Sequence, residues 1–301
     1  MQVIFGPMIP APRVVRFAVR LLRVVPIAPV RWVARAAGAV AFTVARGRRA
    51  TLLENQAHLS PNVSPAARRR LARRTLMNLL DAAVDLFRVP SMRPGELAAL
   101  VAVSGREHLD AARALGKGVV VVTPHLGPYE LGGAWLAVMG YPVHAMVEEI
   151  DPETNAALAL YREATGMKLI SRSRGVRGAL RLLHEGQLVL LVADRVVGEG
   201  GEGVPVFLGD GVRAVPTGPA TLALATGAPI VVGHIARATS GKARYLVQLE
   251  PPIIAEGTGH ASRDREALTR RVAERLAAAV LSHPDQWYVF QPKWLPRDAL
   301  A

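Results

Sequence analysis

The sequence predicts an α/β fold, with a mainly parallel central sheet flanked by helices. Residues 119–123 read VVVVT, and such unbroken β-branched runs are typical of strands covered on both faces. Helical and strand patterns alternate from residue 104 onward, as repeated βα units do. The chain has 301 residues, half of them apolar, which is enough to bury the core of one large domain.

Charge divides the sequence into two parts. Residues 1–80 contain 14 arginines and one acid, Glu54, so they carry the whole net charge of +13. Such asymmetry favours an anionic partner surface, either lipid headgroups or nucleic acid. Only 5% of residues are aromatic and none interrupts the arginine run, so base stacking has no platform. We therefore expect residues 1–100 to be a basic helical appendage that associates with membrane, residues 101–301 to be the core, and nucleic acid not to bind.

The first elements in chain order are two apolar segments. From residue 12 to 25, arginines recur at positions 13, 16, 20 and 23, which fall on one stripe of a helix whose other residues are apolar. Residues 32–44 form a second apolar stretch, about 13 residues long and thus shorter than the roughly 20 needed to cross a bilayer. We expect residues 1–46 to lie on a membrane without spanning it. The alternative is a basic helix packed on its own domain.

The next helix is predicted to open at Ser64-Pro65 and to run to about Phe87, because serine caps helices and proline suits their first position. Five arginines between residues 68 and 74 lie early in it. They would attract lipid phosphates, or they form an ordinary solvated face.

The remaining elements follow from periodicity and turn residues. The predicted strands are 118–123, 141–147, 188–193, 229–235 and 244–249, and the predicted helices are 107–115, 130–139, 152–165, 175–185, 217–226 and 263–281.

His125 is the strongest candidate for a functional residue. The strand before it breaks at Pro124, a Gly/Pro turn follows, and a helix begins near Tyr129. A side chain at the carboxyl end of a central strand stands where open α/β sheets place their sites. Glu130 lies in the first turn of that helix, and an imidazole paired with a carboxylate makes a general base.

The spacing of His125 and Glu130 is weak evidence alone, because eight histidines and 24 acidic residues give chance matches. His144 and Glu149 have the same spacing, but His144 lies inside an alternating strand pattern and is expected to be structural. The predicted strand, turn and helix around His125 therefore favour His125 over His144 as the site residue.

A second strand ends at Asp194-Arg195, so these residues are expected at the same sheet edge as His125. Glu199 or Glu202, in the glycine-rich loop beyond, could then approach His125, unless that loop is a surface loop with solvated charges. Arg162 and Arg195 are candidate cations for an anionic headgroup, or else they form surface salt bridges.

The sequence lacks the residues that several functional classes require. The chain has no cysteine, which excludes disulfides, thiolate nucleophiles and sulfur-ligated metals. It contains no GxSxG, Walker A or HExxH motif. Gly198, Gly200 and Gly203 satisfy GxGxxG, but residues 204–207 continue as strand or loop where a dinucleotide fingerprint opens a helix. We expect no metal site and no resident cofactor.

Several segments resemble a known family. They are HLGPYE after the valine run, LVADR, VFLG followed by VPTGPATLALATGAPIV, and the ending HPDQWYVFQPKWL. The first three resemble the lipid A biosynthesis acyltransferase branch of the lysophospholipid acyltransferase superfamily. The ending is similar to that of the phosphatidylinositol mannoside acyltransferases in this branch. The resemblance covers roughly residues 48–295.

The resemblance implies an α/β domain with a membrane-associating N-terminal helix, peripheral at the cytoplasmic face of the plasma membrane. Such an enzyme transfers a fatty acyl chain from acyl-CoA, as co-substrate, to a mannose hydroxyl of an anionic glycolipid. The family motif usually ends in Asp, where this chain has Glu130. A further glutamate that contacts the histidine in the family corresponds to Glu199 or, with a gap, Glu202.

On this reading His125 deprotonates the sugar hydroxyl, with Glu130, Glu199 or both orienting the ring, and no acyl-enzyme forms. Main-chain N–H groups at the helix start after Gly127 are the candidate oxyanion donors. Three alternatives stay open: a lysophospholipid or lipid A type acyltransferase with another lipid acceptor, a non-catalytic protein that binds anionic membranes, and a hydrolase in which His125 activates water.

Overall fold

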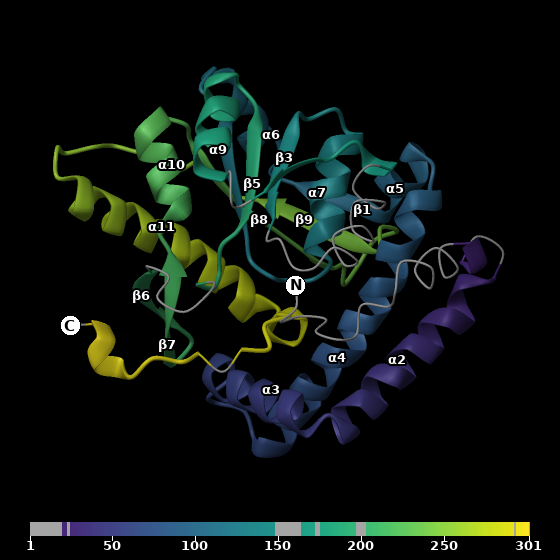
Figure 1. Cartoon of the computed structure of the whole chain (residues 1–301). Helices are drawn as coiled ribbons and strands as arrows, with labels where there is room; N and C mark the ends of the chain where they lie inside the picture. The colour runs from purple at the N-terminus through teal and green to yellow at the C-terminus, as the bar shows by residue number, and fades with distance from the viewer. Residues whose placement is uncertain are drawn as a thin grey trace.

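A seven-stranded sheet forms the centre of the molecule (Figure 1). The computed structural model describes residues 20–22, 25–147, 164–171, 175–196, 203–291 and 293–300. The strand order is β1-β9-β8-β2-β5-β3-β4, and the neighbours are parallel except for the antiparallel pair β8 and β9. The predicted fold class is therefore confirmed. The strands are β1 (Val101–Ser104), β2 (Val119–Thr123), β3 (Val143–Val147), β4 (Lys168–Ser171), β5 (Leu188–Val192), β8 (Ile230–Arg237) and β9 (Tyr245–Leu249).

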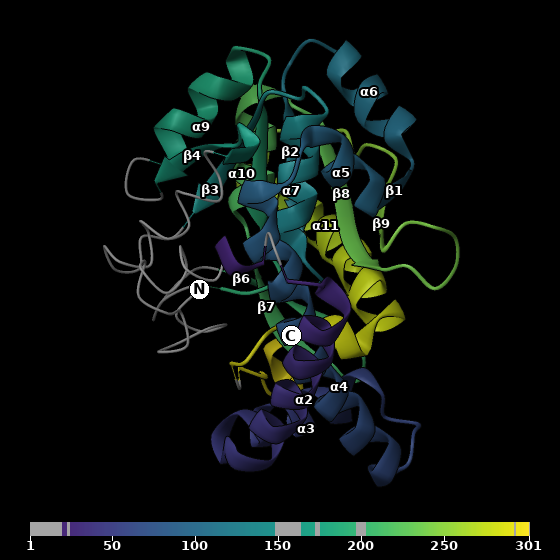
Figure 2. The same cartoon turned by 90° about the vertical axis from the view of Figure 1, so that its right-hand side faces the viewer.

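Helices cover both faces of the sheet (Figures 1 and 2). Side chains of a strand point alternately to its two faces, so Val119 and Val121 of β2 pack with α5, α6 and α7, whereas Val120 and Val122 pack with α9, α10 and α11. Each buried valine contributes on the order of 1.5–3 kcal/mol. The helices are α5 (Pro94–Leu100), α6 (Arg106–Ala114), α7 (Tyr129–Val138), α9 (Gly175–His184), α10 (Gly218–Thr226) and α11 (Ala261–Ser282).

A two-stranded antiparallel hairpin, β6 (Gly203–Leu208) and β7 (Gly211–Pro216), stands beside the main sheet. Because β6 starts at Gly203, the third glycine of the GxGxxG pattern opens a strand, as predicted. The sequence analysis missed β1, β4 and β7, and the predicted helix at 152–165 lies almost wholly outside the described residues.

Three helices form a layer at one end of the molecule: α2 (Ile27–Val44), α3 (Arg46–Leu59) and α4 (Pro65–Arg88). Ser64 caps α4 by accepting a hydrogen bond from Ala67 N–H, which confirms the predicted start. α2 runs along α4 so closely that a Cβ at Gly38 would lie 2.7 Å from the Leu76 carbonyl oxygen. The first predicted helix, residues 12–25, lies largely outside the described residues.

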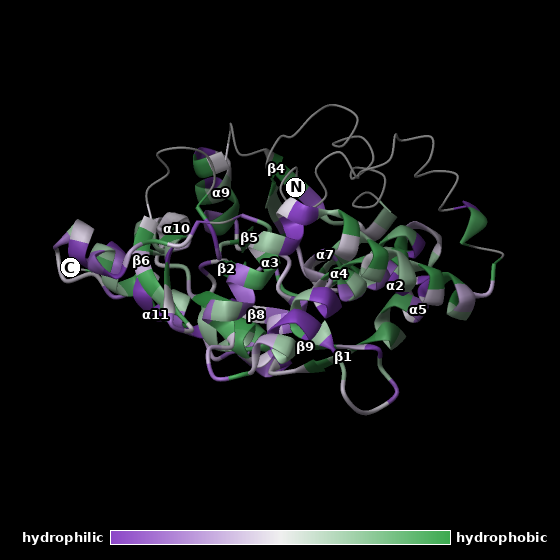
Figure 3. Cartoon of the chain, turned by 90° about the horizontal axis from the view of Figure 1, so that it is seen from below, coloured by the Kyte–Doolittle hydropathy of each residue, from purple (hydrophilic) through white to green (hydrophobic). Residues whose placement is uncertain are grey.

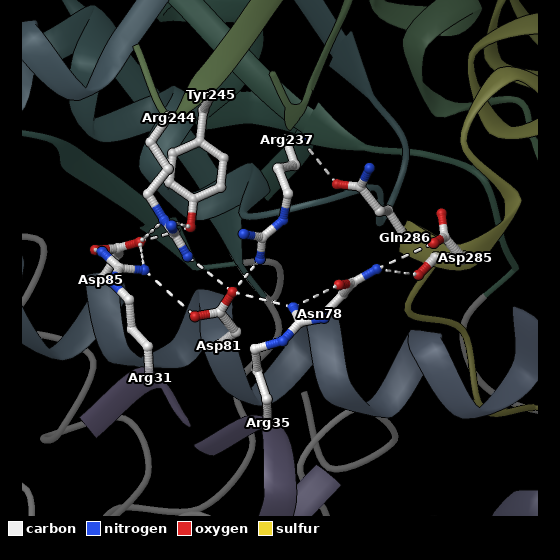
Figure 4. Close-up of polar contacts among 10 residues, drawn as sticks. All are labelled: Arg31, Arg35, Asn78, Asp81, Asp85, Arg237, Arg244, Tyr245, Asp285 and Gln286. Atoms are coloured by element: carbon white, nitrogen blue, oxygen red, sulfur yellow. Dashed lines mark hydrogen bonds and ion pairs between the residues drawn. The ribbon is translucent and has the colours of Figure 1, made fainter. Parts of the chain in front are cut away.

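An ionic network joins this helical layer to the sheet (Figure 4). Its centre is Asp81 and Asp85 of α4, both almost fully buried. Arg31 of α2 donates hydrogen bonds to the carboxylates of Asp81 and Asp85. Arg244, the residue before β9, donates to the same two carboxylates. Arg237 of β8 and Arg35 of α2 add ion pairs to Asp81. Buried charges need such partners, since a lone one would be costly to desolvate.

The segment 284–290, which we call the strap, passes between the helical layer and the sheet. The side-chain amides of Asn55 and Gln56 in α3 donate to the carbonyls of Val289 and Pro284, at 2.7 and 2.6 Å. Asn78 of α4 donates to the Asp285 carbonyl at 3.0 Å (Figure 4). These bonds fix the strap on the helical layer.

Candidate active site

His125 follows the central strand of the sheet, two residues beyond the end of β2. Its turn depends on Gly127, whose φ of +55° suits glycine and whose Cβ, if present, would lie 2.1 Å from the Ile235 carbonyl oxygen. Helix α7 then begins at Tyr129, and the Tyr129 ring meets the His125 ring edge to face, with centroids 5.3 Å apart. The predicted sequence of strand, turn and helix is confirmed.

Asp194 is the carboxylate bonded to His125. Its Oδ1 lies 2.5 Å from His125 Nδ1, and its Oδ2 accepts a hydrogen bond of 2.9 Å from the His125 main-chain N–H. The pairing follows from strand register, because Thr123 of β2 lies opposite Val192 of β5, and His125 and Asp194 each come two positions later. The prediction that Asp194 and His125 share a sheet edge is confirmed. The prediction did not name Asp194 as the partner.

Trp287 of the strap completes the surroundings of Asp194. Its indole Nε1–H donates to Asp194 Oδ2 at 2.7 Å. Burial alone raises the pKa of Asp194, but the charge and hydrogen bonds of His125 and the bond from Trp287 outweigh it and lower this pKa from 3.8 to about 2. Asp194 is therefore ionised at neutral pH and acts only as an acceptor.

The lowered pKa of Asp194 predicts a loss of stability in acid. A carboxylate whose pKa is lower in the folded state stabilises the fold above its ordinary pKa, and that contribution is lost as the pH falls through the folded-state pKa. We expect the free energy of unfolding, measured with urea, to fall between pH 4 and pH 2 more steeply in the wild type than in Asp194→Asn. Equal slopes in the two proteins would contradict the assignment.

The structure describes only some of the other predicted site residues. Glu130 lies in the first turn of α7, as expected, and its role toward His125 stays a prediction. Glu199, Glu202 and Arg162 lie outside the described residues, so their roles also stay predictions. Arg195 is buried directly after Asp194, so the alternative that made it an ordinary surface residue is wrong.

Two of the main-chain groups considered as oxyanion donors are already engaged. Tyr129 N–H donates to the Gly127 carbonyl at 2.9 Å, and Leu131 N–H donates to the Pro128 carbonyl at 2.7 Å. A developing oxyanion would have to displace these bonds, so they are poor donors for it.

A narrow apolar cleft lies between α7 and the sheet. Thr123 and Tyr129, which flank His125 on the chain, are among its lining residues. Gly132 and Gly133 of α7 face Leu190 and Val247 of the sheet in the rest of the cleft. Most of its lining is aliphatic, so it suits a hydrocarbon group.

Two further observations limit the chemistry. Among the described residues, no group of three or more His, Asp or Glu side chains could hold a metal ion. His144, the other histidine with an acid five residues later, is buried within β3, and burial lowers its pKa. It is a strand residue, as predicted.

Comparison with known proteins gives a consistent result. The family model for bacterial lipid A biosynthesis acyltransferases matches residues 12–296. The chain is 32% identical over 218 residues to a phosphatidylinositol mannoside acyltransferase of Mycobacterium tuberculosis, covering 70% of this chain and 66% of that protein. It is 30% identical over 216 residues to the protein of the same name from Mycolicibacterium smegmatis, covering 70% and 68%. A lipid A biosynthesis acyltransferase of Haemophilus influenzae is 23% identical over 184 residues, covering 61% and 55%.

Proposed function

Because the chain belongs to the bacterial lipid A biosynthesis acyltransferase family, we propose that it is an O-acyltransferase that moves a long fatty acyl chain from acyl-CoA to a mannose hydroxyl of a phosphatidylinositol mannoside. The observation that carries the proposal is the buried, hydrogen-bonded pair of His125 and Asp194 near an apolar cleft. The names of the mycobacterial relatives support the acceptor.

The catalytic step follows from the tautomer of His125. Since Asp194 is an ionised acceptor, the proton of the imidazole lies on Nδ1 and points at Asp194 Oδ1, which leaves the Nε2 lone pair as the base. Nε2 takes the proton of the mannose hydroxyl as its oxygen attacks the thioester carbonyl. Asp194 stabilises the imidazolium that results. Collapse of the tetrahedral intermediate breaks the C–S bond, and the imidazolium gives its proton to the departing thiolate.

The cleft would receive part of the acyl chain of the donor. A hydrocarbon tail in the cleft loses contact with water, at about 25 cal/mol per Å² of buried apolar surface. Thr123 and Tyr129 line the cleft and flank His125 on the chain, so we place the carbonyl carbon at the head of the acyl chain next to the base. Glu130 and Glu199 remain proposed as second carboxylates that orient the ring, with Arg162, Arg195 and Glu202 proposed to contact the substrates.

Membrane contact would come through α2. Its exposed side chains include Trp32, Val33, Val40 and Val44, whereas other residues of the helix pack along α4. Figure 3 shows α2 beside α4. At 18 residues, α2 is longer than the predicted apolar stretch and apolar enough to cross a membrane by length and composition. The contact with α4 favours a helix that lies in the interface, as an amphipathic helix does. We propose peripheral association with the cytoplasmic face of the plasma membrane, where acyl-CoA is present.

The test is a transfer assay with vesicles that contain mannosylated phosphatidylinositol and with radiolabelled palmitoyl-CoA. We expect label in the glycolipid, one free CoA for each acyl group transferred, and protein that sediments with the vesicles. Palmitoyl-acyl carrier protein, as an alternative donor, tests the preference for acyl-CoA.

Parallel assays with a lysophospholipid or a lipid A precursor separate the acceptors. Label found only in one of these would replace the mannoside acceptor but keep the acyl transfer. Free fatty acid that forms at the same rate with and without acceptor would identify a hydrolase and overturn the proposal. Protein that stays in the supernatant would contradict the membrane contact.

A further inference from the structure

We infer that Trp287 is a positioning residue of the active site: its indole N–H fixes the orientation of the Asp194 carboxylate, and through it the ring of His125. The inference rests on the proposed function where it concerns turnover. Trp287 comes from the strap, 93 positions from Asp194 in sequence, and its Nε1–H lies 2.7 Å from Asp194 Oδ2.

The two oxygens of Asp194 have different partners. Oδ1 takes the bond from the His125 ring, and Oδ2 takes those from the His125 main-chain N–H and the Trp287 indole. The terminal torsion of an aspartate is broad by itself, so the carboxylate needs donors on both oxygens to hold one angle. Asp194 and Trp287 are 5% and 1% exposed, so water cannot readily replace the indole.

The main chain of the strap is fixed separately from this side chain. The Tyr288 N–H donates to the His125 carbonyl, and the Gly127 N–H donates to the Gln286 carbonyl, both at 2.8 Å. Leu126 and Trp287 form an antiparallel bridge between these bonds. A change limited to the Trp287 side chain therefore leaves the strap paired with the His125 turn.

Phenylalanine is a suitable replacement for Trp287. It keeps an apolar aromatic ring in the cluster where Trp287 packs with Leu126 and Val289. It also keeps a ring face for the buried guanidinium of Arg213, which lies 5.3 Å from the Trp287 ring centroid. What it removes is the donor to Asp194.

Trp294 offers a matched control. It lies beside Trp287, with ring centroids 6.3 Å apart, and it contacts the same guanidinium at 5.1 Å. Its indole N–H also makes one side-chain hydrogen bond, of 3.0 Å, but the acceptor is Asn55 Oδ1. Trp294→Phe therefore removes the same chemical group without touching Asp194.

The first measurement is steady-state acyl transfer by Trp287→Phe and Trp294→Phe. We expect Trp287→Phe to lower kcat by roughly ten- to a hundredfold, the size of a lost hydrogen bond to a charged group, with the KM of both substrates unchanged. Trp294→Phe should stay within about twofold of the wild type. Equal losses of kcat in the two variants, or a change confined to KM, would overturn the inference.

The second measurement needs no substrate, so it separates this inference from the proposed function. The hydrogen bond from Trp287 helps to lower the pKa of Asp194, and its removal moves that pKa back toward the ordinary value. The stability lost between pH 4 and pH 2 should therefore be smaller in Trp287→Phe than in the wild type, and unchanged in Trp294→Phe. If Trp287→Phe loses less stability than the wild type but the wild type shows no acyl transfer, the proposed function fails and the positioning role stands. If the three proteins lose the same stability, the positioning role fails.

Discussion

Replacing His125 by alanine is expected to lower the kcat of acyl transfer by about 10²- to 10⁴-fold, the usual contribution of a general base. A sugar hydroxyl has a pKa far above 7, so without a base at the Nε2 position it attacks the thioester only slowly. The measurement is the vesicle assay with palmitoyl-CoA, under conditions in which the wild type is saturated with both substrates. Retention of most of the activity would exclude the proposed mechanism.

Two variants separate loss of the base from loss of the fold. His125→Asn keeps an N–H near the position of Nδ1, so it can still donate to Asp194, but it has no nitrogen acceptor in place of Nε2. We expect it to be as inactive as His125→Ala and more stable. His144→Asn changes the other histidine that has a glutamate five residues later, and we expect nearly full activity because His144 lies within β3.

Asp85→Ala is expected to cost about 3–5 kcal/mol of unfolding free energy, the usual result of removing one partner from a buried ion pair. The Asp85 side chain is fully buried and binds Arg31, Arg244 and the hydroxyl of Tyr245. Without it the two guanidinium groups, which both donate to Asp85 Oδ2, keep Asp81 as their shared carboxylate. Urea denaturation measures the loss, and limited proteolysis should cut α2 sooner, because α2 is held to α4 by Arg31.

Asp110→Ala provides the comparison for Asp85. Asp110 also binds a tyrosine hydroxyl, that of Tyr141 at 2.8 Å, and an arginine, Arg106 at 3.6 Å. Both Asp110 and Arg106 are about half exposed, so water can replace the lost contacts. The expected cost is about 0–1 kcal/mol. Similar losses in the two variants would show that the Asp85 network is not the main attachment of α2.

The central fold could be predicted because both of its signals are local. The valine run of β2 and the alternation of helices and strands are patterns within short windows of sequence. β1 and β4 were missed because each has only four residues and lies at an edge of the sheet, where a short strand leaves little periodicity. The packing of α2 along α4 was also beyond the sequence, since it depends on Gly38 meeting the backbone of a helix some forty residues away.

The site could be predicted in part. His125 was found from its turn, and Asp194 was placed at the correct edge of the sheet. The preferred partners of His125, however, were Glu130 and Glu199, which the family resemblance implies. The sequence does not show that β2 and β5 are direct neighbours with Thr123 opposite Val192. This register brings His125 and Asp194, each two residues after its strand, into contact. Trp287 carried no signal of its own, because its role depends on a strap that joins the sheet edge from 93 positions away.

The charge analysis was incomplete for a similar reason. Counting residues 1–80 separated the arginines from Asp81 and Asp85, which follow immediately. Arg31 and Arg35 point inward to these acids, so they neutralise internal charge and do not face a membrane (Figure 4). Arg69, Arg70, Arg73 and Arg74 of α4 remain exposed.

The strap also sets when the hydrogen-bonded cluster of His125, Asp194 and Trp287 can become complete during biosynthesis. Ribosomes make a chain from its N-terminus at about 5–20 residues per second, and early segments fold first. β2 and β5 can meet once residue 192 has emerged, yet Asp194 lacks its indole donor until Trp287 has followed. In the nascent chain the carboxylate of Asp194 therefore waits for its indole donor while 93 further residues are added.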